Sequence, residues 1–216
     1  LLYVQRFFEP IRTLTMHYAL LQRAVASGHR IFELLDIPLA IADKPDAQPI
    51  GDTSGRIEFK DVTFGYDPER PILRNISFVA EPGQTIALVG PTGSGKTSIT
   101  ALAHRFYDVQ EGSITIDGYD IRDVMQESIG DVMGMVLQEP FLFSKPVLEN
   151  VRYNTLDATR EDVVTACKVI GAHDFVMQLD NGYDTTLEQR GSNLSVGQRQ
   201  LLSFARALVA DPKILV

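Results

Sequence analysis

The stretch that decides the fold is "GPTGSGKT", residues Gly90 to Thr97, which matches the pattern G-x-x-x-x-G-K-[ST]. It follows the apolar run "QTIALVG" (84–90), which is typical of a buried strand, and it opens "GKTSITALAHRFY" (95–107), which is typical of a helix. Glycines in such a loop let backbone N–H groups turn inward around phosphate oxygens. The stretch therefore predicts a triphosphate-binding loop at the N-terminus of a helix.

Two side chains of this loop have separate expected roles. Lys96 places a positive charge against the β- and γ-phosphate oxygens, and the hydroxyl of Thr97 is a ligand for Mg²⁺. The loop by itself indicates only a nucleoside triphosphate, because kinases, GTPases, DNA-repair ATPases and transporters all use it. The residues expected to bind ATP here are Gly90, Pro91, Thr92, Gly93, Ser94, Gly95, Lys96, Thr97 and Ser98.

Three segments are recognisable around the loop. Residues 1–36 carry apolar residues in steps of three and four, which predicts a long amphipathic helix, and we expect a kink or a break at Pro10. Residues 37–55 are rich in Pro, Asp and Gly and have no period, which is typical of a linker. From residue 56 onward, strand-like and helix-like runs alternate. This alternation predicts an α/β domain with a mainly parallel core sheet and an antiparallel region at its start.

The expected elements of this domain can be placed by residue range. Besides 84–90, the runs that read as strands are "RIEFKDVTF" (56–64), "NISFVA" (75–80), "SITIDG" (113–118), "MGMVLQ" (133–138) and "KILV" (213–216). Besides 95–107, the runs that read as helices are "REDVVTACKVI" (160–170) and "VGQRQLLSFARALVA" (196–210).

Composition limits the classes of function. The formal net charge of −8 argues against a general nucleic-acid-binding protein, because phosphate backbones require a basic surface. The single cysteine, Cys167, falls on a predicted helix and is expected to be a buried structural thiol in a reducing compartment. No apolar run is long enough to cross a bilayer, and the N-terminus has neither an initiator Met nor a signal-peptide layout. We therefore expect the chain to be part of a longer protein.

A second anion-binding helix end is predicted near the C-terminus of the chain. In "NLSVGQ" (193–198), Ser195 and Gln198 have the spacing of a capping box, and an apolar helical run follows. The backbone N–H groups of such a first turn form an anion site. A well-capped surface helix is the alternative interpretation.

Several motifs together resemble those of a known family. From Arg56 to its end, the chain resembles the nucleotide-binding domain of ATP-binding cassette (ABC) transporters. "VTFGYDPERPILRNISF" (62–78) is similar to the segment whose aromatic residue, here Tyr66, stacks on adenine. "MVLQEPFLFS" (135–144) is similar to the Q-loop. The resemblance implies that Gln138 reaches Mg²⁺ and the attacking water, and that this loop touches the transmembrane part.

The segment "NLSVGQ" resembles the family signature, which normally reads Leu-Ser-Gly-Gly-Gln. In the family, two domains pack head to tail and each signature helix faces the ATP on its partner's loop. The resemblance thus implies that the second anion site serves another molecule's ATP, bound in trans. The residues expected to bind it are Ser195, Val196, Gly197 and Gln198.

Two further segments resemble exporters in particular. "RIFELLDIP" (30–38) is similar to the cytoplasmic end of the last membrane helix of exporters. "LEQRGSN" (187–193) is similar to a segment that usually reads Gly-Glu-Arg-Gly and contacts the membrane domain, but Glu188-Gln189 replace the usual Gly-Glu. A second departure is Val196, which stands where the signature usually has glycine and could crowd the phosphate. We still expect binding there, because the backbone N–H groups remain.

A third departure concerns catalysis. The sequence stops at "DPKILV" (211–216), before the Asp-Glu pair that in the family supports Mg²⁺ and polarises the attacking water. Neither His104 nor His173 matches the family's switch histidine. We therefore expect the 216-residue chain to bind ATP weakly at most and not to turn it over, and the full-length parent to be an ATPase.

The resulting hypothesis is an exporter-type ABC half-transporter with ATP and Mg²⁺ as cofactors. Residues 1–36 would be the end of the last membrane-domain helix, residues 37–55 a linker, and residues 56–216 the nucleotide-binding domain on the cytoplasmic side of an inner or plasma membrane. Its partners would be a second nucleotide-binding domain, the transmembrane domain of the same chain and an unidentified substrate, without nucleic acid. Two alternatives stay open: a soluble ABC-type ATPase that acts on DNA ends or ribosomes, and a binding-only cassette of a heterodimer.

Overall fold

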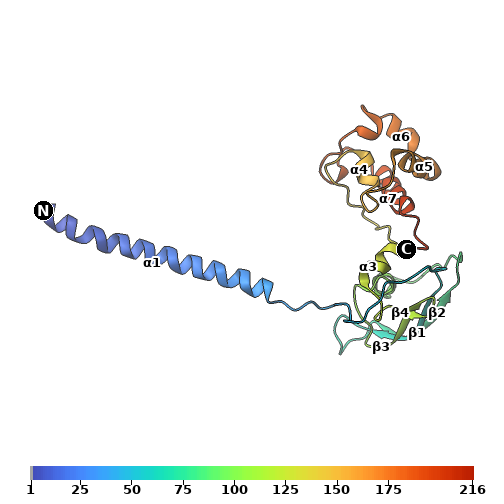
Figure 1. The fold of residues 1–216 in the computed structure, drawn as a ribbon, viewed down its shortest axis with the longest axis horizontal. Helices are drawn as coiled ribbons and strands as arrows, with labels where there is room; N and C mark the ends of the chain where they lie inside the picture. Colours follow the sequence, from blue (N-terminus) through green and yellow to red (C-terminus); the bar gives the residue numbers. More distant parts are fainter. Residues whose placement is uncertain (1) are drawn as a thin grey trace. The chain divides into compact units, whose positions relative to one another are not determined.

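The computed structural model describes residues 2–216, which fall into two compact units, Leu1–Ala42 and Asp43–Val216. The first unit contains α1 (Leu2–Leu35), a 34-residue helix with Pro10 inside it (Figure 1). Of the expected kink or break at Pro10, the break does not occur, because a proline removes only one backbone hydrogen bond and the turns on either side of it continue the helix. The apolar residues of the predicted helix face are exposed in this chain, among them Phe7, Leu14 and Leu21.

Among residues 2–216, no helix combines the length and the apolar character needed to span a bilayer.

The second unit begins with the antiparallel region that the sequence predicts. Strands β1 (Ile57–Phe64), β2 (Leu73–Ala80), β3 (Glu111–Ile116) and β4 (Tyr119–Asp120) form a four-stranded antiparallel sheet in the order β2-β1-β3-β4. Buried residues alternate along β1 as a one-faced strand requires, with a change of register between Phe59 and Val62 that restores the inward direction.

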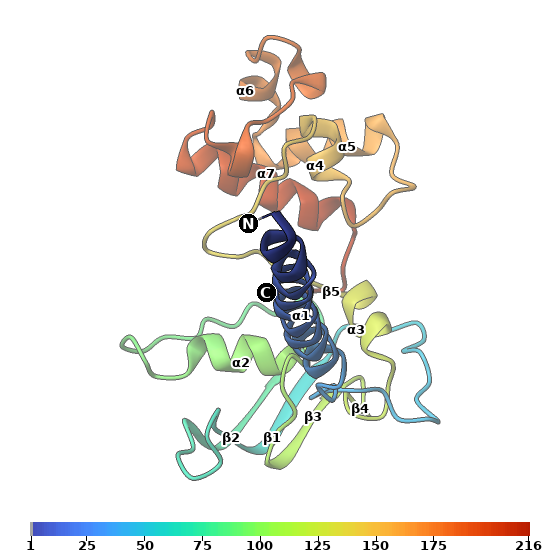
Figure 2. The same cartoon turned by 90° about the vertical axis from the view of Figure 1, so that its left-hand side faces the viewer.

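One face of this sheet carries the first hydrophobic core. Phe59 and Ile114 of the sheet pack with Leu102 of α2 (Lys96–Ala103) and Ile129 of α3 (Gln126–Val132). In Figure 2, α2 and α3 lie next to the labelled strands. The helix that follows the glycine loop is therefore held by burial of its C-terminal half against the sheet.

The parallel part of the fold is smaller than the sequence predicts. It consists of β5 (Met133–Gly134) and β6 (Ile214–Leu215), which pair in parallel. The strand predicted at residues 84–90 was wrong: residues 85–90 have no strand structure and are exposed. Residues 135–138 likewise continue beyond β5 without strand structure. A buried parallel strand needs neighbours along both edges, and among the described residues no strand pairs with segment 84–90.

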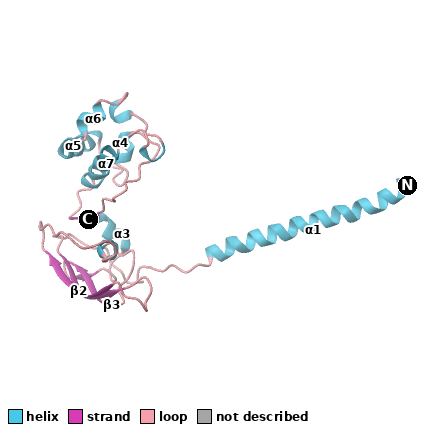
Figure 3. Cartoon of the chain, turned by 180° about the vertical axis from the view of Figure 1, so that it is seen from behind, coloured by secondary structure: helices cyan, strands magenta, loops and turns pink. Residues whose placement is uncertain are grey.

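A helical part follows between β5 and β6, apart from the strands (Figure 3). Its core joins Val163 and Cys167 of α5 (Arg160–Ile170), Val176 of α6 (His173–Met177), and Leu202 and Ala205 of α7 (Val196–Val209). Cys167 is fully buried, as expected, and burial raises the pKa of its thiol. The elements are α4 (Val147–Val151), α5 (Arg160–Ile170), α6 (His173–Met177), the 3₁₀ turns η1 (Gly182–Asp184) and η2 (Gln189–Gly191), and α7 (Val196–Val209).

Within the second unit, polar contacts connect the segment before β1 to α3 and to the chain around it. Asp43 pairs with the buried Arg105 at 3.3 Å and accepts a hydrogen bond from the backbone N–H of Gln126 at 3.0 Å. Lys44 forms an ion pair with Asp123. These contacts place residues 43–55 along the second unit, next to α3.

A single carboxylate, that of Asp117, organises the turn that leads into β1. It accepts hydrogen bonds from the backbone N–H of Ser54 at 2.6 Å and from the Ser54 hydroxyl at 2.5 Å. The N–H groups of Gly55 and Arg56 donate to it at 3.1 and 3.2 Å. Burial raises the pKa of Asp117, but these hydrogen bonds outweigh burial and lower the pKa below its usual value of 3.8.

We expect Asp117 to make the stability of the chain depend on acidity. Because its pKa is lower in the folded state, its contribution is present above the unfolded-state pKa and is lost as the pH falls through the folded-state value. Urea unfolding at pH 7 and at steps below about pH 4 should show a smaller loss of stability for Asp117→Asn than for the wild type. Asp157→Asn, at an exposed position, is the control. If the free energy of unfolding falls equally with pH in the wild type and in Asp117→Asn, this role of Asp117 is contradicted.

A buried amide, that of Asn150, fixes the loop before α4. Its Oδ1 accepts a hydrogen bond from the backbone N–H of Phe143 at 2.8 Å, and its Nδ2 donates to the carbonyls of Phe143 and Lys145 at 3.0 Å each. Asn150 is buried, so a truncated side chain would leave the backbone N–H of Phe143 without its partner, whereas both carbonyls keep a backbone donor.

We therefore expect Asn150→Ala to lower the free energy of unfolding by about 1–3 kcal/mol, because a buried backbone group without a partner costs about that much. Denaturant unfolding of this chain measures the change, with the exposed Asn154→Ala as the matched control. Equal stabilities of the two variants would contradict the assignment.

Candidate nucleotide-binding site

The predicted triphosphate loop has the backbone geometry that its glycines permit. Gly93 and Gly95 have φ angles of 85° and 90°, in the region that favours glycine. A Cβ atom on Gly95 would come within 2.5 Å of Leu73 Cδ2, and one on Gly90 within 2.6 Å of Ser94 Oγ. The loop thus passes close to its neighbours and turns in a way that other residues could not follow without strain.

Helix α2 begins directly behind this loop without a side-chain cap. Its N-cap is Gly95, which makes no side-chain hydrogen bond. The first backbone N–H groups of a helix have no partner within the helix, and the helix dipole adds partial positive charge there. The start of α2 is therefore suited to an anion.

Lys96 adds a full positive charge to the same place. Its Nζ donates hydrogen bonds to the carbonyl oxygens of Gly90 at 2.8 Å and Pro91 at 2.9 Å. The ammonium group is thus held by the backbone of the loop. An ammonium group, uncapped N–H groups and a glycine turn fit a polyphosphate.

Ser98 lies in the first turn of α2, but its side chain faces inward. It is 5 % exposed, and its hydroxyl lies 3.2 Å from the hydroxyl of Tyr66. The Tyr66 ring, 55 % exposed, packs edge to face with Tyr107 at a centroid distance of 5.1 Å. The structure therefore brings the expected adenine-stacking residue next to the first turn of α2.

The two expected Mg²⁺ ligands lie on separate elements. Thr97 is exposed in the first turn of α2. Gln138 lies on the segment after β5, beside a hollow of about 440 Å³ that it lines with Gln200 and Phe204 of α7, and Thr97 does not line this hollow. Among residues 2–216, no group of three or more His, Cys, Asp or Glu side chains could hold a metal ion. Mg²⁺ usually combines one or two protein ligands with phosphate oxygens, so the Thr97 hydroxyl fits it beside a triphosphate.

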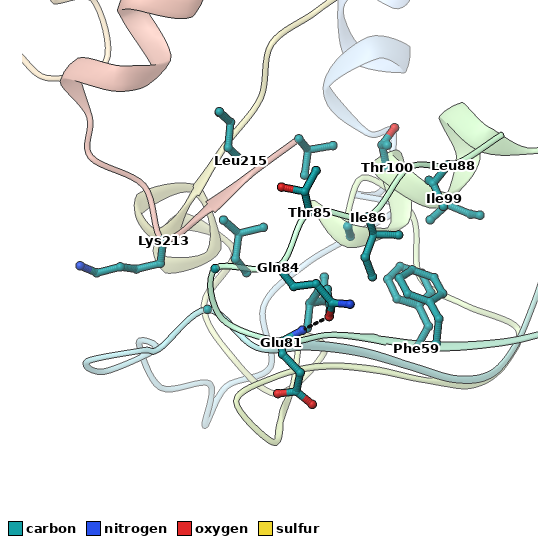
Figure 4. Close-up of a pocket in the computed structure, with 18 residues that line it drawn as sticks. Phe59, Glu81, Gln84, Thr85, Ile86, Leu88, Ile99, Thr100, Lys213 and Leu215 are labelled. Carbon is teal, nitrogen blue, oxygen red and sulfur yellow. Dashed lines mark hydrogen bonds between the residues drawn. The ribbon is translucent and has the colours of Figure 1, made fainter. Parts of the chain in front are cut away.

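A larger cavity of about 630 Å³ is lined in part by Ile99 and Thr100 of α2 (Figure 4). It is bordered by residues 84–86 and by Phe59, Ile99 and Leu215, and most of its lining is apolar. Residues 90–97 do not line it. This cavity is therefore not the phosphate site, and segment 84–90 runs along it as an exposed chain.

The predicted capping box at the start of α7 is present. The backbone N–H of Gln198 donates to Ser195 Oγ at 3.2 Å, and the N–H of Ser195 donates to Gln198 Oε1 at 2.9 Å. Ser195 Oγ accepts this bond, so its hydroxyl proton is available to an outside acceptor. Val196 is exposed, which places its side chain outside the core.

The chain before α7 is fastened to that helix by a residue that the sequence did not single out. Arg199 Nη1 donates to the carbonyl of Leu194 at 2.7 Å and to that of Gly191 at 3.4 Å. Glu188, in the segment that departs from the exporter pattern, accepts a hydrogen bond from the Ser192 hydroxyl at 2.8 Å. Residues 188–194 and the N-terminal part of α7 are thus connected by side-chain hydrogen bonds.

A second such residue, Arg206, connects α7 to the segment after Gln138. Its Nε donates to the carbonyl of Asn150 at 2.8 Å, and its Nη1 donates to that of Phe141 at 3.1 Å. Burial lowers the pKa of Arg206, while the nearby Tyr153 raises it. Sequence reasoning missed this link because its ends lie 56 and 65 residues apart.

Comparison with known proteins agrees with this geometry. The family model described as "ABC transporter" matches residues 73–216. An uncharacterized ABC transporter ATP-binding protein of Bacillus subtilis, YfiC, is 44% identical over 216 residues, which is 99% of this chain and 35% of that protein. The fatty acid ABC transporter ATP-binding/permease protein of Mycobacterium tuberculosis is 40% identical over 215 residues, 99% of this chain and 34% of that protein.

A solved structure of a bacterial Atm1-family ABC exporter with ATP bound is similar in fold as well, with a TM-score of 0.87 and 38% sequence identity. The match covers 99% of this chain and 37% of that one, so the chain spans about a third of the length of the proteins it matches. The mixed α/β class and its antiparallel start are thereby confirmed as the fold of an ABC nucleotide-binding domain. With its glycine loop, uncapped helix and capped signature helix in place, this chain belongs to the ABC transporter family.

Proposed function

We propose that this chain is the ATP-binding part of an ABC exporter, in which ATP binding and hydrolysis drive transport of a substrate across a membrane. The observation that carries the proposal is the glycine loop, where Lys96 is held by the carbonyls of Gly90 and Pro91 ahead of an uncapped helix. The names of several relatives combine ATP-binding with permease or export functions, which favours an exporter over a soluble ATPase.

In this proposal, different residues bind the phosphates, the adenine and the Mg²⁺ ion. The backbone of residues 90–98 and the ammonium of Lys96 bind the phosphates, and Tyr66 presents its ring to adenine. Thr97 and Gln138 are the protein ligands of Mg²⁺, and Gln138 also orients the attacking water. Bound Mg²⁺ would supply charge neutralisation during phosphoryl transfer.

The signature helix serves a second domain. Two cassettes pair head to tail, so that Ser195, Gly197 and their neighbours in the first turn of α7 bind the γ-phosphate on the partner's loop. The capping box supports this role because it fixes the Ser195 side chain at the helix start. Val196 is compatible with it, since its side chain is exposed and the contact uses backbone N–H groups.

The remaining parts of the chain connect this site to transport. Residues 1–36 are the cytoplasmic end of the last membrane-domain helix, 37–55 the linker and 56–216 the nucleotide-binding domain, on the cytoplasmic side of the membrane. The full-length protein hydrolyses ATP as a dimer of such chains or with a related partner. The names of three relatives give three different substrates, namely fatty acid, β-(1→2)glucan and lipid A-core.

Lys96 offers the direct test. In the full-length exporter, Lys96→Ala should lower ATP turnover by about 100-fold or more, because a lost charge contact to a transferring phosphoryl group costs about 3 kcal/mol. Phosphate release by the purified protein in lipid measures it, with the exposed Lys60→Ala as the matched control. Turnover of Lys96→Ala equal to that of Lys60→Ala would refute the proposed function.

The trans arrangement can be tested without damage to the helix cap. Ser195→Asp keeps a good N-cap but puts a negative charge against the γ-phosphate, so it should abolish turnover, whereas the neutral cap Ser195→Asn should retain more activity. Mixed dimers of a Ser195→Asp copy with a Lys96→Ala copy should regain turnover, because one of their two sites then has both intact residues. Tandem purification of two differently tagged copies isolates these dimers. If the mixed dimers are as inactive as either parent, Ser195 does not act in trans.

A further inference from the structure

Three aromatic rings meet at the edge of the candidate adenine site. Phe64 ends β1, Tyr66 follows it, and Tyr107 comes from the segment after α2. The Tyr66 ring is edge to face with Phe64 at 5.2 Å and 81°, and with Tyr107 at 5.1 Å and 80°. Tyr107 also contacts Phe64, with ring centroids 5.5 Å apart. Tyr66 is therefore packed against two rings that also pack against each other.

The backbone beside Tyr66 is held by the same distant segment. Gln110 accepts a hydrogen bond from the N–H of Gly65 at 2.7 Å through Oε1 and donates to the Gly65 carbonyl at 2.7 Å through Nε2. Both polar groups of Gly65 are thus bound by one side-chain amide. A Cβ on Gly65 would come within 2.6 Å of the Arg70 carbonyl oxygen, so the turn that carries Tyr66 is also tightly folded.

A third contact reaches Tyr66 from the phosphate side. Its hydroxyl lies 3.2 Å from the hydroxyl of Ser98, which is buried in the first turn of α2. Tyr66 nevertheless remains 55 % exposed. Its ring is thus fixed by neighbours on one side and open on the other, which is the state that a stacking surface for a flat base requires.

We propose that Tyr107 and Gln110 are the positioning residues of the adenine platform: Tyr107 fixes the orientation of the Tyr66 ring and Gln110 fixes the backbone that carries it. The inference rests on the proposed function, since it assumes that Tyr66 stacks on adenine. Its physical basis is preorganisation, because an aromatic ring that is already held loses less conformational freedom when the base binds.

Tyr107 is better explained by this role than by core packing. It is 43 % exposed, so removal of its ring takes little from the buried core. Both residues lie beyond the end of α2, whose first turn carries Lys96, Thr97 and Ser98. One continuous segment, 96–110, therefore supplies the phosphate contacts at one end and the support of the adenine platform at the other.

The test uses the full-length exporter and compares ATP with inorganic tripolyphosphate, a competitor that has phosphates but no base. Tyr107→Ala should raise the KM for ATP about 2- to 10-fold with kcat unchanged, since an aromatic pair contributes about 0.5–1.5 kcal/mol. Gln110→Ala should act in the same direction. Neither should change the inhibition constant of tripolyphosphate. Tyr107→Phe, which keeps the ring, should have the wild-type KM.

Two further variants make the readout specific. Tyr119→Ala, at another exposed tyrosine, is the matched control and should leave the KM unchanged. In a Tyr66→Ala background, Tyr107→Ala should add no further effect, because Tyr107 acts through the Tyr66 ring.

Each contrary result has a distinct meaning. If Tyr66→Ala raises the KM but Tyr107→Ala and Gln110→Ala do not, the inference is overturned and the proposed function stands. If Tyr107→Ala weakens the inhibition by tripolyphosphate as much as it raises the KM for ATP, the role of Tyr107 is structural and the inference is overturned. The same holds if Tyr107→Phe has the same KM as Tyr107→Ala. An unchanged KM in Tyr66→Ala overturns the inference as well, while Lys96→Ala still reports separately on ATP turnover.

Discussion

The start of α2 is the constraint on which the rest of the site depends. Gly95 supplies no side-chain cap, and Lys96 is held against the carbonyls of Gly90 and Pro91, so positive charge collects at one turn. That turn can stay uncapped because the other half of the helix is anchored through Leu102 and Ala103 in the sheet's core. Burial at the C-terminal half thus compensates for an N-terminus left open to an anion.

The two helix ends proposed to bind anions are built differently. α2 begins with a bare glycine, whereas α7 begins with a closed capping box between Ser195 and Gln198. An uncapped end with a lysine suits an anionic ligand of its own domain. A capped end keeps its shape alone and offers a hydroxyl proton and backbone N–H groups to a ligand on another surface. This difference agrees with one end acting in cis and the other in trans.

Local patterns account for much of the fold and of the candidate site. The glycine loop, the helix behind it, α5, α7 and the Ser195 capping box all follow from neighbouring residues, because their hydrogen bonds and periodicities close within a few positions. The strands of the antiparallel start follow from their own residues, but β1 pairs with β3 across more than 40 positions. The failure at residues 84–90 has the opposite cause. An apolar run becomes a strand only when it pairs with other strands, and the residues of the run do not show whether such strands lie beside it.

The sequence by itself determined the class of ligand, since a glycine turn, a lysine and a helix start lie within eight consecutive residues, Gly90 to Thr97. Only the tertiary structure decided what surrounds them. Gln110 binds the backbone of Gly65 across 45 positions, and Arg206 binds the carbonyl of Asn150 across 56. Such contacts depend on where the sheet and helices bring the chain together. A hydrogen bond between distant residues leaves no local pattern in the sequence, whereas a loop formed by consecutive residues can be recognised from those residues.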